Sequence, residues 1–259
     1  MFRPLQQLRY RLHAHVVTWF GQSGHVDAGY DSNDPNVIYR QIDEMASQGI
    51  RAVNLLFSGK DSPNTPALFT WSSIAQSQGV TISLCWDKQA KTTAEDVRWM
   101  QKFLIKPAQN YWKLPDGRSV LLVFDDPSAD QLAALDPSIA VLYRNTNGFS
   151  KPKSAGCFGW PSPGNEQGYV DYFAKQLAPL QTQQQNKIVM PHISPGFVGA
   201  SWNKADPNFK PTPWDNGREW QRSIQRVLDM SKTLKFSDVL IGTFNDHEEG
   251  TGIESVPIL

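Results

Sequence analysis

The sequence predicts an α/β fold, a (β/α)8 TIM barrel that spans residues 1–259 as a single domain with an irregular or missing last helix. Short aliphatic runs alternate with helical patterns along the chain, as in parallel sheets covered by helices. The length of 259 residues suits one such barrel. No repeat, low-complexity tract or linker divides the chain.

The first half of the chain contains four predicted strands, at residues 13–20, 52–57, 80–86 and 120–124. The first helix is the clearest one. Asp34 is a typical N-cap, Pro35 suits the first helical position, and Gly49 marks the end. Two further helices are predicted at residues 65–78 and 93–109, where apolar side chains recur with helical spacing.

The second half repeats this alternation less regularly. Strands are expected at residues 139–143, 156–160, 187–192 and 239–244, and helices at residues 129–135, 168–180 and 217–233. Only fifteen residues follow Phe244, which is why the last helix is expected to be irregular or missing. Either the N-terminal segment 5–11 covers that gap, or the barrel is incomplete there.

The charge balance argues against a polyanionic partner. The chain has 25 basic and 25 acidic residues and a formal net charge of zero, whereas nucleic-acid binders usually carry a basic excess or stripe. We therefore expect a neutral ligand and no nucleic acid. We also expect a monomer.

No apolar run approaches the ~18 residues that a membrane span needs, so no membrane partner is expected. The N-terminus lacks the hydrophobic region of a signal peptide; removal of a leader would place the protein in a secreted or periplasmic compartment. Cys85 and Cys157 both lie in apolar runs, which predicts two buried free thiols. A bridge between them would require neighbouring strands.

Polar and aromatic side chains follow the predicted strands at the edge where barrel enzymes build their sites. They are Trp19, Phe57, Trp86 with Asp87, Asp125 with Asp126, Arg144 with Asn145, Trp160, His192, and Asn245 with Asp246. Indole rings stack on the C–H faces of sugars, while acids and amides bond to hydroxyls. Any one of these residues can simply end a strand in water. The set as a whole predicts a carbohydrate site that needs no metal or cofactor.

The densest polar cluster is Asn245-Asp-His-Glu-Glu-Gly250, directly after the last predicted strand. Like charges this close raise the pKa of at least one carboxyl group. Two carboxyl groups with separated pKa values can divide the work of general acid and general base. The alternative interpretation is a helix start, with Asp246 as N-cap and Glu249 as its capping-box partner.

Four segments carry a resemblance to a known family. They are Trp19-Phe-Gly21 with Gly29-Tyr-Asp-Ser32, Phe103 through Trp112 into Leu121-Leu-Val-Phe124, Pro191-His-Ile-Ser-Pro-Gly-Phe197 with Asn216-Gly-Arg-Glu-Trp220, and Thr243 through Glu254. Together they resemble glycoside hydrolases of families 99 and 71 and their bacterial relatives. The last segment is the most specific one, since it combines Asp246, as in family 71, with Glu249-Gly-Thr251, as in family 99.

The resemblance implies a barrel enzyme that cleaves an α-linked polysaccharide or glycan of the α-mannan or α-glucan type from within. It places Glu249 at the position of the general acid/base and Asp246 at that of its catalytic partner. In family 99 that partner is a Glu, which assists attack by the sugar's own 2-hydroxyl. Asp246 is one methylene shorter, so a water-activating role for it stays open.

The residues predicted to bind substrate are Trp19, Tyr30, Asp31, Trp86, Asp125, Trp160, His192, Trp214, Asn245 and His247. Several have a structural alternative. His192 can be a satisfied structural group, Asp125 lies next to a possible helix start, and Asp31 lies near the Asp34 cap.

Two other functions compete with hydrolysis of a glycan. His13 and His15 point to one side of a strand and, with His192 and Asp246, hint at a metal-dependent amidohydrolase-type barrel. A carbohydrate-binding barrel without catalysis would keep the tryptophans and tolerate loss of Glu249. The presence of both Asp246 and Glu249 favours catalysis.

Overall fold

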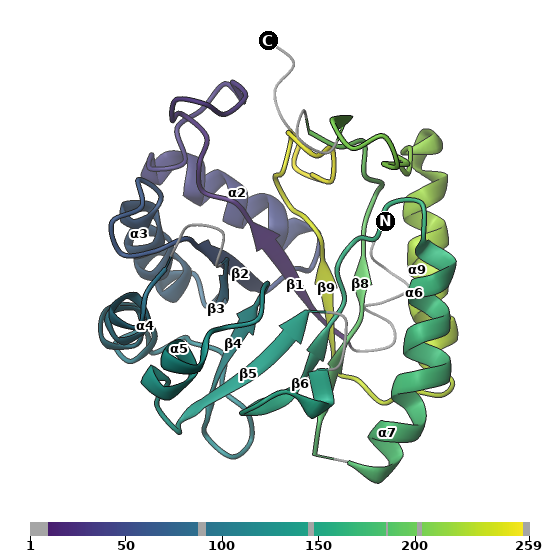
Figure 1. The fold of residues 1–259 in the computed structure, drawn as a ribbon. Helices are drawn as coiled ribbons and strands as arrows, with labels where there is room; N and C mark the ends of the chain where they lie inside the picture. The colour runs from purple at the N-terminus through teal and green to yellow at the C-terminus, as the bar shows by residue number, and fades with distance from the viewer. Residues whose placement is uncertain (1–9, 88–91, 145–147, 185, 201–203, 256–259) are drawn as a thin grey trace.

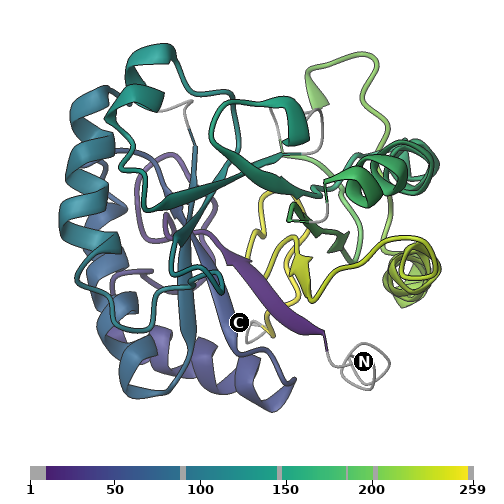
Figure 2. The same cartoon turned by 90° about the horizontal axis from the view of Figure 1, so that it is seen from below.

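The computed structural model describes residues 10–255 apart from 88–91, 145–147, 185 and 201–203. Parallel strands form a single sheet in the order β7-β6-β5-β4-β3-β2-β1-β9-β8, which curls into a barrel (Figures 1 and 2). The strands are β1 Arg11–Val16, β2 Ala52–Phe57, β3 Thr81–Trp86, β4 Ser119–Val123, β5 Ile139–Arg144, β6 Ser154–Phe158, β7 Ile188–Met190, β8 His192–Ile193 and β9 Asp238–Ile241. The predicted barrel is thus confirmed.

Pro191 divides the predicted strand at residues 187–192 into two pieces. β7 pairs with β6, whereas β8 pairs with β9. Proline has no backbone N–H to donate to a sheet, but its carbonyl oxygen still accepts a hydrogen bond from the N–H of Leu240 at 2.9 Å. β7 and β8 together therefore act as the seventh strand of eight, and they close the barrel.

The helices surround the sheet (Figure 2). They are α2 Pro35–Ser47, α3 Thr65–Ser77, α4 Ala94–Met100 with η2 Gln101–Ile105, α5 Ala129–Ala134, α6 Glu166–Asp171 with η4 Tyr172–Leu177 and α7 Ala178–Gln183, and α9 Arg218–Met230. Among the described residues between β5 and β6, the short η3 Gly148–Ser150 is the helical element. Residues 242–255 contain no helix, as predicted. Residues 1–9, which include most of the proposed gap-covering segment, lie outside the described part.

Side chains alternate along each strand between a helix-facing layer and the barrel interior. On β1, Leu12, Ala14 and Val16 join the large cluster under the helices. His13 and His15 therefore face inward. The interior is filled mainly by apolar side chains from β3 to β7, with Trp112 and Trp160.

Several predicted strands extend too far towards the site. The first strand ends at Val16 and the last at Ile241, because the apolar residues that follow turn into loops at the barrel mouth. The sixth strand lies two residues earlier than predicted, at Ser154–Phe158. Cys85 and Cys157 are buried and free, and they belong to different packing layers.

Candidate active site

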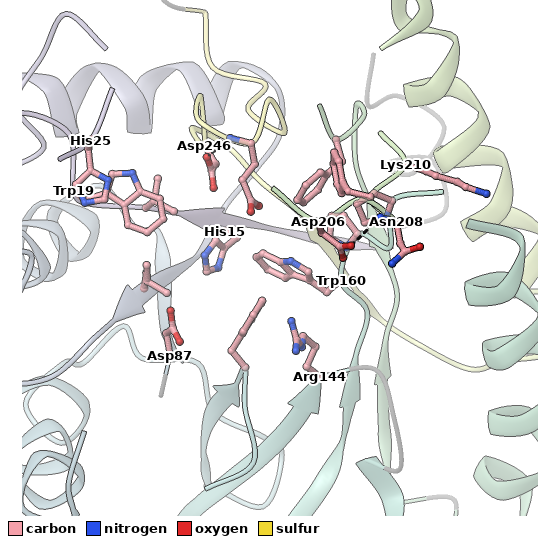
Figure 3. Close-up of a pocket in the computed structure, with 18 residues that line it drawn as sticks. His15, Trp19, His25, Asp87, Arg144, Trp160, Asp206, Asn208, Lys210 and Asp246 are labelled. Atoms are coloured by element: carbon pink, nitrogen blue, oxygen red, sulfur yellow. Dashed lines mark hydrogen bonds between the residues drawn. The ribbon is translucent and has the colours of Figure 1, made fainter. Parts of the chain in front are cut away.

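A cavity of about 600 Å3 opens at the carboxyl ends of the strands (Figure 3). Its size is within the range of small-molecule sites. The lining comes from most of the barrel and from the long segment between β8 and α9. It includes His15, Val17, Trp19, His25, Leu56, Asp87, Phe124, Arg144, Trp160, Pro161, Pro163, Phe197, Asp206, Asn208, Phe209, Lys210, Asp246 and Glu249.

The acid pair Asp246 and Glu249 lines this cavity from the segment after β9. Residues 247–250 form a turn rather than a helix. Oδ1 of Asp246 accepts a hydrogen bond from the backbone N–H of Glu249 at 2.9 Å. The capping interpretation is therefore right about the hydrogen bond and wrong about the helix: Asp246 holds the turn and faces the cavity as well.

Asp246 is the carboxyl group with the raised pKa. Burial raises the pKa of Asp246 to about 6, and the negative charge of Glu248 adds to the increase. The backbone hydrogen bond from Glu249 opposes this effect because it stabilises the charged form. The direction agrees with the raised pKa predicted for this cluster, but burial rather than repulsion between the carboxylates is its main cause.

Aromatic rings form the floor and one wall of the cavity. Trp160 packs edge-on against His15 and Phe124, with ring centroids 4.8 and 4.9 Å apart. Trp19 stacks on His25 with centroids 4.9 Å apart and planes at 7°. The predicted positions of Trp19 and Trp160 at a shared cavity agree with the structure.

The opposite wall includes Asp206, Asn208 and Lys210, which lie across from Trp19 in Figure 3, and Phe209 also lines the cavity. An isolated antiparallel bridge between Phe197 and Thr212 holds the base of this segment. These residues belong to a loop without a periodic pattern. No pattern in the sequence therefore identified them as site residues.

The positively charged side chain of Arg144 lines the floor of the cavity. Its guanidinium carbon lies 3.8 Å from the centroid of the Phe124 ring, and one nitrogen lies 3.8 Å from a carboxylate oxygen of Asp125. Asp87 lines the cavity on the same side (Figure 3). Asp125 thus orients Arg144 and is not among the lining residues, contrary to its prediction as a substrate contact. Asn145 lies outside the described residues.

The prediction that Trp86 binds substrate is wrong. The side chain is buried under the helices, and its Nε1 donates to Oγ1 of Thr92 at 2.9 Å. Strand alternation explains the error: Trp86 shares its face with Ile82 and Leu84, whereas Asp87 follows on the inner face. Trp86 does not line the cavity and is no longer a candidate sugar platform.

Three residues predicted to bind substrate instead form hydrogen bonds within the protein, outside the cavity. Tyr30 and His247 both bond to the carboxylate of Glu254, at 2.8 and 3.1 Å. The Asn245 amide bonds to both the N–H and the carbonyl oxygen of Val17, each at 2.9 Å. These residues do not line the cavity, and their polar groups are occupied in joining β9 to β1 and α2.

The remaining predicted contacts also lie off the cavity. Asp31 accepts the backbone N–H of Asn33 within a turn. His192 faces a separate small pocket beside Tyr169. Nε1 of Trp214 donates to the carbonyl oxygen of Gly250 at 3.0 Å, so its indole supports the turn that carries Glu249.

The two inward histidines of β1 do not form a metal centre. Nε2 of His13 lies 2.7 Å from a carboxylate oxygen of Asp238, deep in the barrel, while His15 lines the cavity. Among the described residues, no three His, Cys, Asp or Glu side chains are grouped so that they could hold a metal ion. None of the helices formed by these residues is long and apolar enough to cross a membrane.

The sequence matches no protein-family model and no curated protein. Solved structures do show similarity. A glycoside hydrolase family 99 endo-α-mannosidase from Bacteroides thetaiotaomicron, in complex with bis-tris propane, aligns with a TM-score of 0.74 and 13% identity over 95% of this chain and 87% of that chain. A second structure of that enzyme has a TM-score of 0.72, at 13% identity, over 94% and 87%. The chain therefore has a barrel fold of the family 99 type.

Proposed function

We propose that this protein is a glycoside hydrolase that cleaves an α-linked polysaccharide or glycan from within, of the α-mannan or α-glucan type. One observation carries the proposal: the carboxyl side chains of Asp246 and Glu249 face a common cavity that is lined by indole and phenyl rings. The family 99 type of barrel supports it. The cavity runs from the Trp19–His25 stack to the Asp206–Lys210 segment (Figure 3), which suits a ligand of more than one sugar.

In the proposed reaction the two acids act at the bond between two sugar units. Glu249 is half-buried and donates a proton to the leaving oxygen. Asp246 accepts a proton from the attacking hydroxyl group, which is either a water or a hydroxyl of the sugar itself. Its pKa of about 6 suits a base that is ionised at neutral pH and still basic enough to take a proton.

The decisive experiment combines a substrate screen with a matched pair of variants. Soluble α-mannan and α-1,3-glucan oligosaccharides are incubated with the protein, and the products are separated by size. Glu249→Gln should reduce kcat by ~10²–10⁴-fold, the usual contribution of general acid–base assistance. Glu95→Gln makes the same chemical change on α4, at an exposed side chain that does not line the cavity and lies 3.5 Å from the amino group of Lys60; it should leave turnover unchanged.

Binding of the oligosaccharides without any turnover would reject the catalytic proposal in favour of a carbohydrate-binding barrel. Equal turnover by Glu249→Gln and the unmodified protein would reject the role of Glu249. Circular dichroism of both variants shows whether the fold is retained.

A further inference from the structure

His15 is a buried polar side chain in the cavity that has no role in the proposed proton transfers. It is 2% exposed, and it comes from the inner face of β1, where its neighbour across the sheet is Asn54. Figure 3 shows its ring in the middle of the cavity, beside Trp160, and Asp246 lines the same cavity. A side chain at this place contacts whatever occupies the cavity floor.

The hydrogen-bonding capacity of the His15 ring is unused within the part of the chain that the structure describes. Nδ1 is buried and has no partner, and no described residue bonds to Nε2. His13, two residues earlier on the same face, is bonded to Asp238 at 2.7 Å. Buried polar groups in native proteins are nearly always paired. Nδ1 of His13 is also without a partner, but that ring is held by Asp238 through Nε2. Both nitrogens of His15, which lines the cavity, are left for a ligand.

The imidazole is neutral and held in place. Burial lowers the pKa of His15 to about 3, and no neighbouring carboxylate offsets that effect. Trp160 holds the ring edge-on at 4.8 Å. A neutral imidazole carries one N–H donor and one lone pair. A hydroxyl group, which both donates and accepts, matches these two functions, whereas a neutral imidazole offers an anion no countercharge.

We propose that His15 is a specificity-determining residue that binds one ring hydroxyl of the sugar lying over Trp160, next to the acid pair. The inference rests on the proposed function and deepens it. It assigns recognition of a single hydroxyl, and so of one stereochemical feature of the substrate, to a side chain that does not take part in proton transfer.

Nuclear magnetic resonance of the histidine ring nitrogens tests this without altering the ring. The probes are linear α-mannotriose and α-1,3-linked glucotriose, added to the Glu249→Gln protein so that they are not cleaved. The His15 nitrogen resonances should shift when the preferred probe binds. Those of His13 serve as the internal reference, because that ring is paired with Asp238 below the cavity and should not respond.

Calorimetry with two variants in the same Glu249→Gln background provides the second measurement. His15→Phe keeps a ring against Trp160 and removes both nitrogens; it should weaken binding about 5- to 30-fold, as expected for one lost hydrogen bond. His15→Gln, which restores a donor and an acceptor, should recover part of the affinity. Among mono-deoxy analogues of the probe, one should bind equally to His15→Phe and its parent.

Unchanged affinity in His15→Phe, together with unshifted His15 resonances in a protein that binds the probe, would overturn this inference and leave the proposed function intact. If neither probe nor longer α-mannan and α-1,3-glucan oligosaccharides bind to the Glu249→Gln protein, both the inference and the proposed function are wrong.

Discussion

At the scale of single residues, two tryptophans with similar positions in the sequence have different environments in the structure. Trp86 and Trp160 both end predicted strands and both are buried. Only Trp160 lines the cavity, because Trp86 lies on the helix-facing side of β3. Alternation along β3 was the available signal, since it places the neighbouring Asp87 on the inner face.

This difference predicts a split between stability and binding. Trp160→Phe should lower affinity for an α-linked oligosaccharide about 3- to 10-fold, since an aromatic contact contributes about 0.5–1.5 kcal/mol and 1.4 kcal/mol is tenfold. Trp86→Phe removes a comparable indole from the helix-facing layer. It should lower stability without changing affinity. Calorimetric titration and thermal unfolding of both variants check this, and equal losses of affinity would contradict the assigned positions.

A second residue-scale prediction concerns the pH dependence of stability. The pKa of Asp246 rises from 3.8 to about 6 on folding, so the folded state holds the proton more tightly than the unfolded state. This contribution is fully present below pH 4 and is lost as the pH rises through 6. The change corresponds to about 3 kcal/mol.

The Asp246→Asn variant has no ionisable group at position 246, while its amide oxygen can still accept a hydrogen bond from the backbone N–H of Glu249. The stability of the variant relative to the unmodified protein should therefore rise by up to about 3 kcal/mol between pH 4 and pH 7. Urea unfolding at both pH values measures this. A difference that is the same at both would show that Asp246 titrates normally.

At the scale of elements, the segment after β9 depends on a buried carboxylate. The side chain of Glu254 is fully buried and bonds to Tyr30, Arg40, Gln41 and His247. Burial alone would raise the pKa of Glu254, but these hydrogen bonds and the charge of Arg40 hold it below the usual value. Helix α2, the first loop and the turn with the acid pair are thereby joined at one point.

Loss of the Glu254 carboxylate should destabilise the folded protein. Glu254→Gln is expected to cost about 1–3 kcal/mol of stability, because it leaves buried donors less well satisfied. The matched control is Glu44→Gln on α2, where the carboxylate lies 3.9 Å from Arg40 and accepts the N–H of Ser255. The Gln oxygen can still accept that N–H, so this change should cost less than about 1 kcal/mol. Chemical unfolding compares the two, and equal losses would remove the special role of Glu254.

At the scale of the whole molecule, the zero net charge of the chain and the mixed charges of the cavity predict salt-insensitive binding. A neutral glycan displaces no counterions, whereas a polyanion does so and binds less tightly as salt increases. Affinity for an α-linked oligosaccharide should change less than about twofold between 50 and 500 mM NaCl. A steep decline with salt, measured by calorimetry, would indicate an anionic ligand instead.

Local patterns in the sequence were sufficient for the barrel itself. Aliphatic runs of strand length, the Asp34–Pro35 helix start and the acid cluster after the last strand all depend on neighbours along the chain. They predicted the alternation of strands and helices, the missing last helix and the cavity-facing positions of Asp246 and Glu249. The break at Pro191 was also readable, since proline cannot donate a sheet hydrogen bond.

Tertiary structure alone decided which polar side chains face the cavity and which form hydrogen bonds that stabilise the surrounding segments. Tyr30, Asn245 and His247 look as chemically suitable as His15 in the sequence. Their partners, however, lie more than two hundred residues away for Tyr30 and Asn245, and such pairings follow only from the closure of the barrel. The wall at Asp206 to Lys210 likewise reaches the acid pair through folding, because nothing in its local pattern specifies where that loop lies.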